Sequence, residues 1–180
     1  MEFQSERDQI IIQLKAGIKP RLEFEDWQYQ SLAAKFDQAL LELDQEKLKN
    51  ILLVITYTNF GNEIFEALLL NLIEHPKVSA SVVVFALGAC QLHIVERRNK
   101  MGELPSQKFV QALLKLIEHS EPEVVNWALR MLFLMNQSSD SIKKSVRAIK
   151  PWKLSTLFNS YKKDSRLIIN EMQRSWSLTK

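Results

Sequence analysis

The chain has 180 residues, enough for about one domain or one and a half, and for a large core without disulfides or metals. Four glycines and five prolines are too few for the frequent turns of an all-β sandwich or barrel, and 25% charged with 46% hydrophobic residues excludes wholesale disorder. The net charge is only +3, and a single cysteine excludes an internal disulfide and a cysteine zinc cage and fits a reducing compartment.

Apolar residues recur at helical spacing through nearly the whole chain. The spacing predicts a short first helix marked by Ile10 and Leu14. A second, longer helix is expected from about Glu23 and a third over residues 47–57, before a break at residues 60–62. The remaining predicted helices lie over residues 62–74, 78–98, 106–118, 122–137, 140–150, 152–162 and 165–176.

Capping signals mark the starts of two of these helices. Ser120 is expected to act as an N-cap, with Glu123 three residues on completing a capping box and Pro122 in the first turn. The next helix has several candidate caps at residues 138–141. Pro151 is expected to end that helix, because the residue before a proline is disfavoured in the helical conformation.

The charges are distributed unevenly. Residues 1–76 carry 7 Lys+Arg and 13 Asp+Glu, for a net charge of −6, and residues 77–140 carry a net charge of +1. Residues 141–180 carry 10 Lys+Arg and 2 Asp+Glu, for a net charge of +8. Such asymmetry can steer an acidic partner to the basic end, and it is equally consistent with head-to-tail self-association.

An internal repeat is the most specific signal in the sequence. Residues 69–75 (LLNLIEH) and 113–119 (LLKLIEH) are identical at six of seven positions, at an offset of 44. Residues 82–87 (VVVFAL) and 124–129 (VVNWAL) share four identities at an offset of 42. A period of 42–44 residues built from two helices is the length expected of HEAT or armadillo units.

The repeated residues also resemble the HEAT family. Residues 113–125, with Ala128 and Leu129 behind them, are similar to a first helix, its tight turn and the start of a second helix, and residues 69–87 follow the same pattern with a longer turn. The resemblance implies an all-α right-handed superhelix (an α-solenoid) of antiparallel, HEAT/armadillo-like helix pairs that bury their apolar faces against one another. The expected organisation is a single helical-repeat domain over 1–180, with N-terminal helices at 1–60, two HEAT-like repeats at 61–137 and basic C-terminal helices at 138–180.

The sequence shows no carrier for catalysis. His75 and His119 stand just after the first helix of each repeat, where a cationic side chain interacts favourably with helix carbonyls, and His93 is expected to have a local or core role. Cys90 lies in an apolar helix and is expected to be a buried small residue rather than a nucleophile. Because no phosphate loop, nucleophile elbow or zinc motif occurs, we expect no enzyme activity, no cofactor and no metal site.

Three carboxylates gather at the start of the second predicted helix, at Glu23, Glu25 and Asp26. Acids at a helix start stabilise the positive end of the helix dipole. This structural role is favoured over an acid–base role in catalysis.

A candidate binding groove follows from the repeat. If residues 78–98 and 122–137 are the second helices of their repeats, they line the concave face, and their common stripe of small, apolar and amide-bearing residues suits an extended peptide or a partner helix. Arg130 is a candidate anchor, because arginine is enriched at interaction hot spots. The stripe includes Ser81, Gly88, Val95 and Glu123, and its candidate partner-binding residues are Val84, Gln91, Arg98, Asn126, Arg130, Phe133 and Gln137.

Trp127 invites a base-stacking role, because some HEAT-like DNA glycosylases use aromatic side chains in a basic groove. Its repeat equivalent is Phe85, flanked by the same Ala-Leu pair. A large aromatic residue that recurs at one repeat position favours core packing instead.

The basic C-terminal segment is a second candidate surface. Its charges alternate with aromatic residues, and nucleic acid, an anionic membrane surface or an acidic protein could all use it, whereas an amphipathic helix that caps the superhelix needs no ligand. The residues of this predicted basic patch are Lys143, Lys144, Arg147, Lys150, Lys153, Lys162, Lys163 and Arg166.

These observations favour a non-catalytic protein–protein interaction module or adaptor, which binds a protein segment in the concave groove while the basic patch steers an acidic partner. The first alternative is a nucleic-acid-binding protein or HEAT-like DNA-repair glycosylase, and the second is a structural oligomerisation unit. The longest apolar stretch, residues 82–90, is far shorter than the about 20 residues of a membrane-spanning helix, so no transmembrane segment and a cytoplasmic location are expected.

Overall fold

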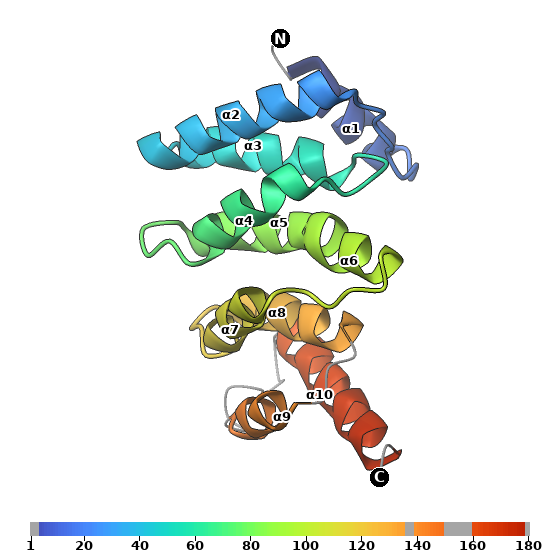
Figure 1. Ribbon diagram of the computed structural model, residues 1–180, viewed down its shortest axis with the longest axis vertical. Helices are drawn as coiled ribbons and strands as arrows, with labels where there is room; N and C mark the ends of the chain where they lie inside the picture. The colour runs from blue at the N-terminus through green and yellow to red at the C-terminus, as the bar shows by residue number, and fades with distance from the viewer. Residues whose placement is uncertain (1–3, 136–138, 150–159, 179–180) are drawn as a thin grey trace. The chain divides into compact units, whose positions relative to one another are not determined.

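The computed structural model describes residues 4–135, 139–149 and 160–178 and is helical throughout (Figure 1). Within these ranges no β-strand forms, and the only extended pairing is one isolated bridge between Leu22 and Thr58. The predicted all-α class is confirmed.

The chain divides into two compact units, Met1–Gly102 and Glu103–Lys180, which are described separately. The first copy of the repeat, residues 69–87, lies in the N-terminal unit, and the second copy, residues 113–129, lies in the C-terminal unit. The single superhelical domain over 1–180 stays a prediction. The helices of the N-terminal unit are α1 (Gln4–Lys15), α2 (Asp26–Glu42), α3 (Gln45–Thr56), the short 3₁₀ helix η1 (Glu63–Phe65), α4 (Glu66–Ile73), α5 (Ala80–Cys90), the π-helical segment η2 (Gln91–Glu96) and α6 (Arg97–Lys100).

Helix pairs build the N-terminal unit. α2 packs against α3, α3 against α5, and α4 against α5, while α1 covers α3. The buried face of α3 presents Leu48, Leu52 and Ile55 at helical spacing. α5 carries no charged residue and is buried on most sides, so it forms the centre of this core.

The C-terminal unit contains α7 (Gln107–Leu116), α8 (Pro122–Leu134), α9 (Asp140–Arg147) and α10 (Ser160–Leu178). α7 packs against α8, and α8 packs against α10. The helix predicted over 165–176 is confirmed as part of α10, but the predicted break after residue 162 is wrong, because α10 runs unbroken from Ser160. Residues 152–159 of the preceding predicted helix lie outside the described residues. The Ser165 hydroxyl donates to the Tyr161 carbonyl one turn earlier at 2.8 Å, so this serine is accommodated inside the helix rather than ending it.

Helix caps explain where several helices begin. Ser139, one of the predicted caps of α9, accepts a hydrogen bond from the Ile142 N–H at 3.4 Å. The predicted Ser120 cap of α8 is wrong, because Glu121 is the N-cap residue and Pro122 is the first helical residue. The Glu121 N–H instead donates a hydrogen bond to Nδ1 of His119.

One continuous helical run, Ala80–Lys100, is long and apolar enough by length and composition to cross a membrane, with a mean hydropathy of 1.3 over its most apolar window. Half of that window is buried inside the structure, and the core helix of a soluble protein passes the same test. The expected lack of a transmembrane segment stays a prediction.

The loop before η1 lies directly against η2. A Cβ placed on Gly61 would lie 2.3 Å from the Leu92 carbonyl oxygen, so only glycine fits there without moving backbone. At Gly88, within α5, the nearest atom to an added Cβ is the Thr56 Cγ2 at 4.0 Å, an ordinary contact.

We therefore predict opposite effects for two glycine-to-alanine substitutions. Gly61→Ala is expected to lower the free energy of unfolding by about 2–4 kcal/mol, because the loop or η2 has to shift. Gly88→Ala is expected to be neutral or to raise it by up to about 1 kcal/mol, because alanine is the better helix former. Urea unfolding followed by circular dichroism measures both, and equal effects would contradict the close approach of loop and π-helix.

Candidate functional site

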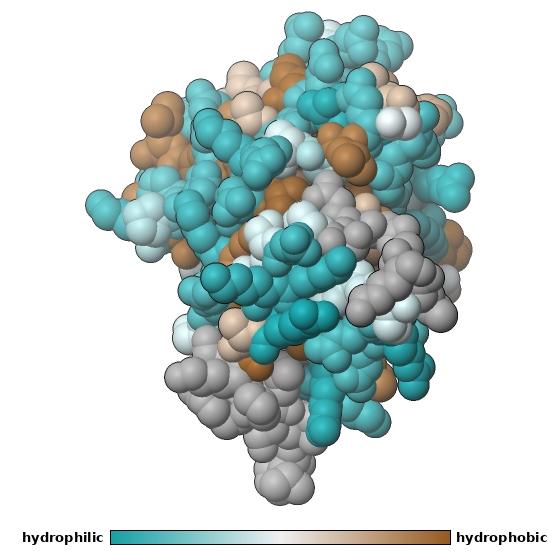
Figure 2. All heavy atoms as spheres, turned by 60° about the horizontal axis from the view of Figure 1, so that its bottom comes forward, coloured by the Kyte–Doolittle hydropathy of each residue, from teal (hydrophilic) through white to brown (hydrophobic). Residues whose placement is uncertain are grey.

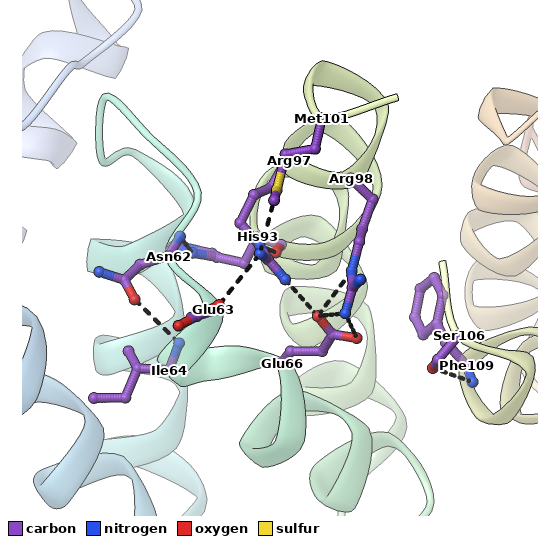
Figure 3. A network of polar contacts seen from close by, with 10 residues as sticks. All are labelled: Asn62, Glu63, Ile64, Glu66, His93, Arg97, Arg98, Met101, Ser106 and Phe109. Carbon is purple, nitrogen blue, oxygen red and sulfur yellow. Dashed lines mark hydrogen bonds and ion pairs between the residues drawn. The ribbon is translucent and has the colours of Figure 1, made fainter. Parts of the chain in front are cut away.

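A buried histidine joins three segments of the N-terminal unit (Figure 3). The His93 side chain is completely buried, and its Nδ1 accepts a hydrogen bond from the Asn62 N–H at 2.9 Å. The ring proton therefore resides on Nε2, which lies 2.9 Å from the Ile55 carbonyl oxygen and donates to it. The edge of the Phe65 ring completes the enclosure, with ring centroids 4.9 Å apart. The expected core role of His93 is confirmed.

The position of this histidine coincides with the π-helical segment η2. A π-helix adds one residue to a turn and occurs mostly as a local insertion, often where a side chain has a special role. In this chain the segment places the imidazole between the end of α3 and the start of η1, where it bonds one backbone group of each, the Ile55 carbonyl and the Asn62 N–H.

An arginine pair lies beside the histidine and binds α4. In Figure 3 the side chains of Arg97 and Arg98 both point at the Glu66 carboxylate. Arg97 also donates from Nε to the His93 carbonyl at 3.0 Å, and its side chain is only 13% exposed. Arg98 Nη2 lies 3.1 and 3.2 Å from the two Glu66 oxygens. Because two largely covered charges share one carboxylate, this cluster fastens α6 to α4.

We predict a pH dependence of stability from His93. Burial lowers the pKa of His93 from its ordinary 6.5 to about 4, so the unfolded chain binds this proton first as the pH falls. The contribution of His93 is complete above pH 6.5 and is lost as the pH falls toward 4, a loss of about 3 kcal/mol. Urea unfolding at a series of pH values measures this slope.

Two variants distinguish the contribution of His93 to the pH dependence of stability from the contribution of carboxyl groups. His93→Gln is expected to flatten the pH profile between pH 4 and 6.5, whatever its effect on stability at neutral pH. His75→Gln, in an exposed turn, is expected to keep the wild-type slope. Identical slopes for wild type and His93→Gln would rule out this histidine as their source.

The histidines of the two repeats make the same contact. His75 Nδ1 accepts from the Lys77 N–H at 3.3 Å, and His119 Nδ1 accepts from the Glu121 N–H at 3.0 Å. Their structural role near a helix C-terminus is as expected, and in each case the ring Nδ1 accepts a backbone N–H of the turn that follows the helix. The identical place of the two residues in the repeat is the sequence signal for this shared turn.

The predicted groove residues of the N-terminal unit do not form one exposed stripe. Ser81 is exposed and Val84, Gly88 and Gln91 are half-buried, but Val95 is buried. The prediction for Val95 is wrong because η2 inserts a residue into the turn and rotates the following positions out of the regular spacing. Arg98, further along, is bound to Glu66.

Asn126, the predicted groove asparagine of the C-terminal unit, is not on a free surface. It is 1% exposed, and its amide nitrogen lies 3.2 Å from both the Tyr161 carbonyl and the Ser165 hydroxyl of α10. Its Oδ1 accepts from Arg130 Nε at 2.9 Å. The prediction of an accessible Asn126 is wrong, because α10 packs on this side of α8 and the asparagine joins the two helices.

Arg130 and Phe133 do remain accessible on α8. Arg130 Nη2 lies 3.5 Å from the Asp164 carboxylate, and its Cζ lies 5.6 Å from the centroid of the Trp127 ring. Phe133 is 44% exposed. Gln137 lies outside the described residues. The core role expected for the repeat aromatics is wrong, because Phe85 is 39% exposed and Trp127 is half-buried.

Much of the predicted basic patch is exposed. α9 rests on the buried side chains of Ile142 and Val146, which leaves its lysine and arginine side chains exposed or half-buried. Figure 2 shows that one face of the molecule is mostly hydrophilic, with hydrophobic residues in small separate patches. Lys150 and Lys153 lie outside the described residues. Within the described ranges no acidic partner is found for Lys143, Lys144, Arg147, Lys163 and Arg166.

Two of the three carboxylates at the start of α2, Glu23 and Asp26, border an open pocket of about 490 Å³. Glu25 forms a capping box with Gln28, so its expected helix-start role is confirmed. Glu23 accepts a hydrogen bond from the Asn59 amide at 3.0 Å, and burial raises the pKa of the Tyr29 phenol. The lining offers carboxylates and aromatic rings but no histidine or cysteine: Glu23, Phe24, Asp26, Tyr29, Asn59, Phe60, Gly61 and Asn62.

Cys90 is buried as expected, and burial raises the pKa of its thiol, which suppresses the nucleophilic thiolate. Across the described part of the chain, no group of three or more His, Cys, Asp or Glu side chains is placed to hold a metal ion.

Comparison of the chain with protein-family models, curated proteins and solved structures returned no match.

Proposed function

We propose that this protein is a non-catalytic, cytoplasmic interaction module whose helix pairs stack in a HEAT/armadillo-like right-handed superhelix. It binds an acidic segment of a partner protein, and the C-terminal unit supplies the main contact surface. The observation that carries the proposal is a set of basic side chains on α9 and α10 that form no ion pair among the described residues: Lys143, Lys144, Arg147, Lys163 and Arg166. Such unpaired charges attract and orient an acidic partner.

The surroundings of these charges favour a protein partner over nucleic acid. Phe133, Leu134 and Leu167 expose 44%, 44% and 55% of their surface on α8 and α10, and aromatic, aliphatic and arginine side chains together are typical of protein interfaces. Nucleic acid is therefore the alternative that the binding experiment tests.

The experiment compares two probes of similar charge. One is a labelled peptide of about 20 residues that combines Asp and Glu with Phe and Leu, and the other is a single-stranded DNA of matched net charge. Fluorescence anisotropy at physiological salt is expected to show tighter binding of the peptide. Lys163→Glu with Arg166→Glu is expected to weaken peptide binding about tenfold, because two attractive charges become repulsive.

The control is Lys108→Glu, a single charge reversal at an exposed position on α7. It is expected to leave peptide affinity within about twofold of wild type, since it lies on another helix of the same unit. Tighter binding of DNA than of peptide, with a steep loss of affinity on adding salt, would replace the proposal by the nucleic-acid alternative.

A further inference from the structure

An acidic segment of the chain includes α2, and one face of this helix exposes apolar side chains. Residues 23–46 contain seven Asp or Glu and a single lysine, a net charge of −6 in 24 residues. Along α2 the exposed residues recur at helical spacing and so share one side of the helix. Trp27 and Leu41, toward the two ends of this stripe, are 52% and 79% exposed. The α2 stripe consists of Trp27, Gln30, Ala34, Asp37 and Leu41.

A second stripe, of opposite charge, lies on α10. Ile169, Met172 and Trp176 are buried on one side of this helix. The opposite side is exposed and carries Leu167, which is 55% exposed, between basic side chains. The α10 stripe consists of Lys163, Arg166, Leu167, Asn170 and Arg174.

The two stripes complement each other in charge and in kind. Within the described residues Asp37 has no basic partner, and neither Lys163 nor Arg166 has an acidic one. Each stripe also exposes apolar side chains, Leu41 and Trp27 on α2 and Leu167 on α10. When the stripes meet, Asp37 relieves the repulsion among the cations of the α10 stripe, while the leucines are removed from water.

We propose that copies of this chain associate head to tail, with the α2 stripe of one copy seated on the α10 stripe of the next. A symmetric dimer that placed each stripe against its own copy would bring the basic side chains of the two α10 stripes together, which charge repulsion opposes. A heterologous contact leaves one free stripe at each end, so association continues beyond the dimer. This inference goes beyond the proposed function, because it requires no foreign partner.

Sedimentation equilibrium of the full chain tests the contact. At low salt the weight-average mass is expected to rise from about 21 kDa at micromolar concentration to more than twice that value at about 100 µM. In about 0.5 M NaCl the mass is expected to fall back toward that of one chain, because exposed charges are then screened. A constant mass at all concentrations, or a plateau at two copies, would overturn the proposal.

Two variants identify the stripes, and their mixture gives the decisive result. The α10 variant is Lys163→Glu with Arg166→Glu, and the α2 variant is Asp37→Asn with Leu41→Ser. Each is expected to be monomeric alone, and an equimolar mixture is expected to give only dimers, because it contains one intact pair of stripes. All four positions are exposed, so helicity by circular dichroism is expected to match wild type.

These experiments distinguish a failure of the self-association proposal from a failure of the proposed function. Lys108→Glu, on α7, is expected to associate like wild type. A mixture that stays monomeric, or variants that associate like wild type, would show that these stripes are not the contact. A monomeric wild-type chain that still binds the acidic peptide would overturn self-association and leave the interaction module standing.

Discussion

Enclosure of α5 is the constraint on which the N-terminal unit depends. A helix without a single charged residue needs apolar neighbours on most of its surface, and α3 and α4 supply them. Where the chain enters and leaves this core, its buried backbone N–H and carbonyl groups need hydrogen-bond partners. His93 helps to meet this need, because its Nδ1 accepts the Asn62 N–H and its Nε2 donates to the Ile55 carbonyl, which also accepts from the Thr58 hydroxyl. The enclosed helix and the loop that covers its end therefore depend on the same side chain.

Most helices, and the caps of some, could be predicted from the sequence, because apolar spacing and capping act over a few residues. The exposed surface could not, because exposure depends on elements that are distant in the sequence. Asn126 shares a helical stripe with Arg130, yet α10 covers one and leaves the other accessible. Val95 escaped prediction because the extra residue of a π-helix has no signature in residue type. For Phe85, the size of the side chain indicates how much its burial would stabilise the fold, but not whether another element lies close enough to cover it.

The two proposals use overlapping residues and therefore constrain each other. Lys163 and Arg166 would contact either an acidic partner or the α2 stripe of another copy, but not both at once. Partner binding would then shorten the chains of copies, and the response to a partner would depend on protein concentration as well as on affinity. In such an adaptor the binding surface on α10 would be covered while copies are assembled and would become available when a tighter-binding acidic ligand displaces the neighbouring copy.

The enclosed imidazole has one more consequence, for the measurement of motion. The proton on His93 Nε2 is completely buried and held by a backbone carbonyl, so it exchanges with water only when the N-terminal unit opens around it. Its exchange rate would report that opening directly, from the centre of the unit, without any label or substitution. The exchange rate of this side-chain proton would therefore measure how often the core of the N-terminal unit opens.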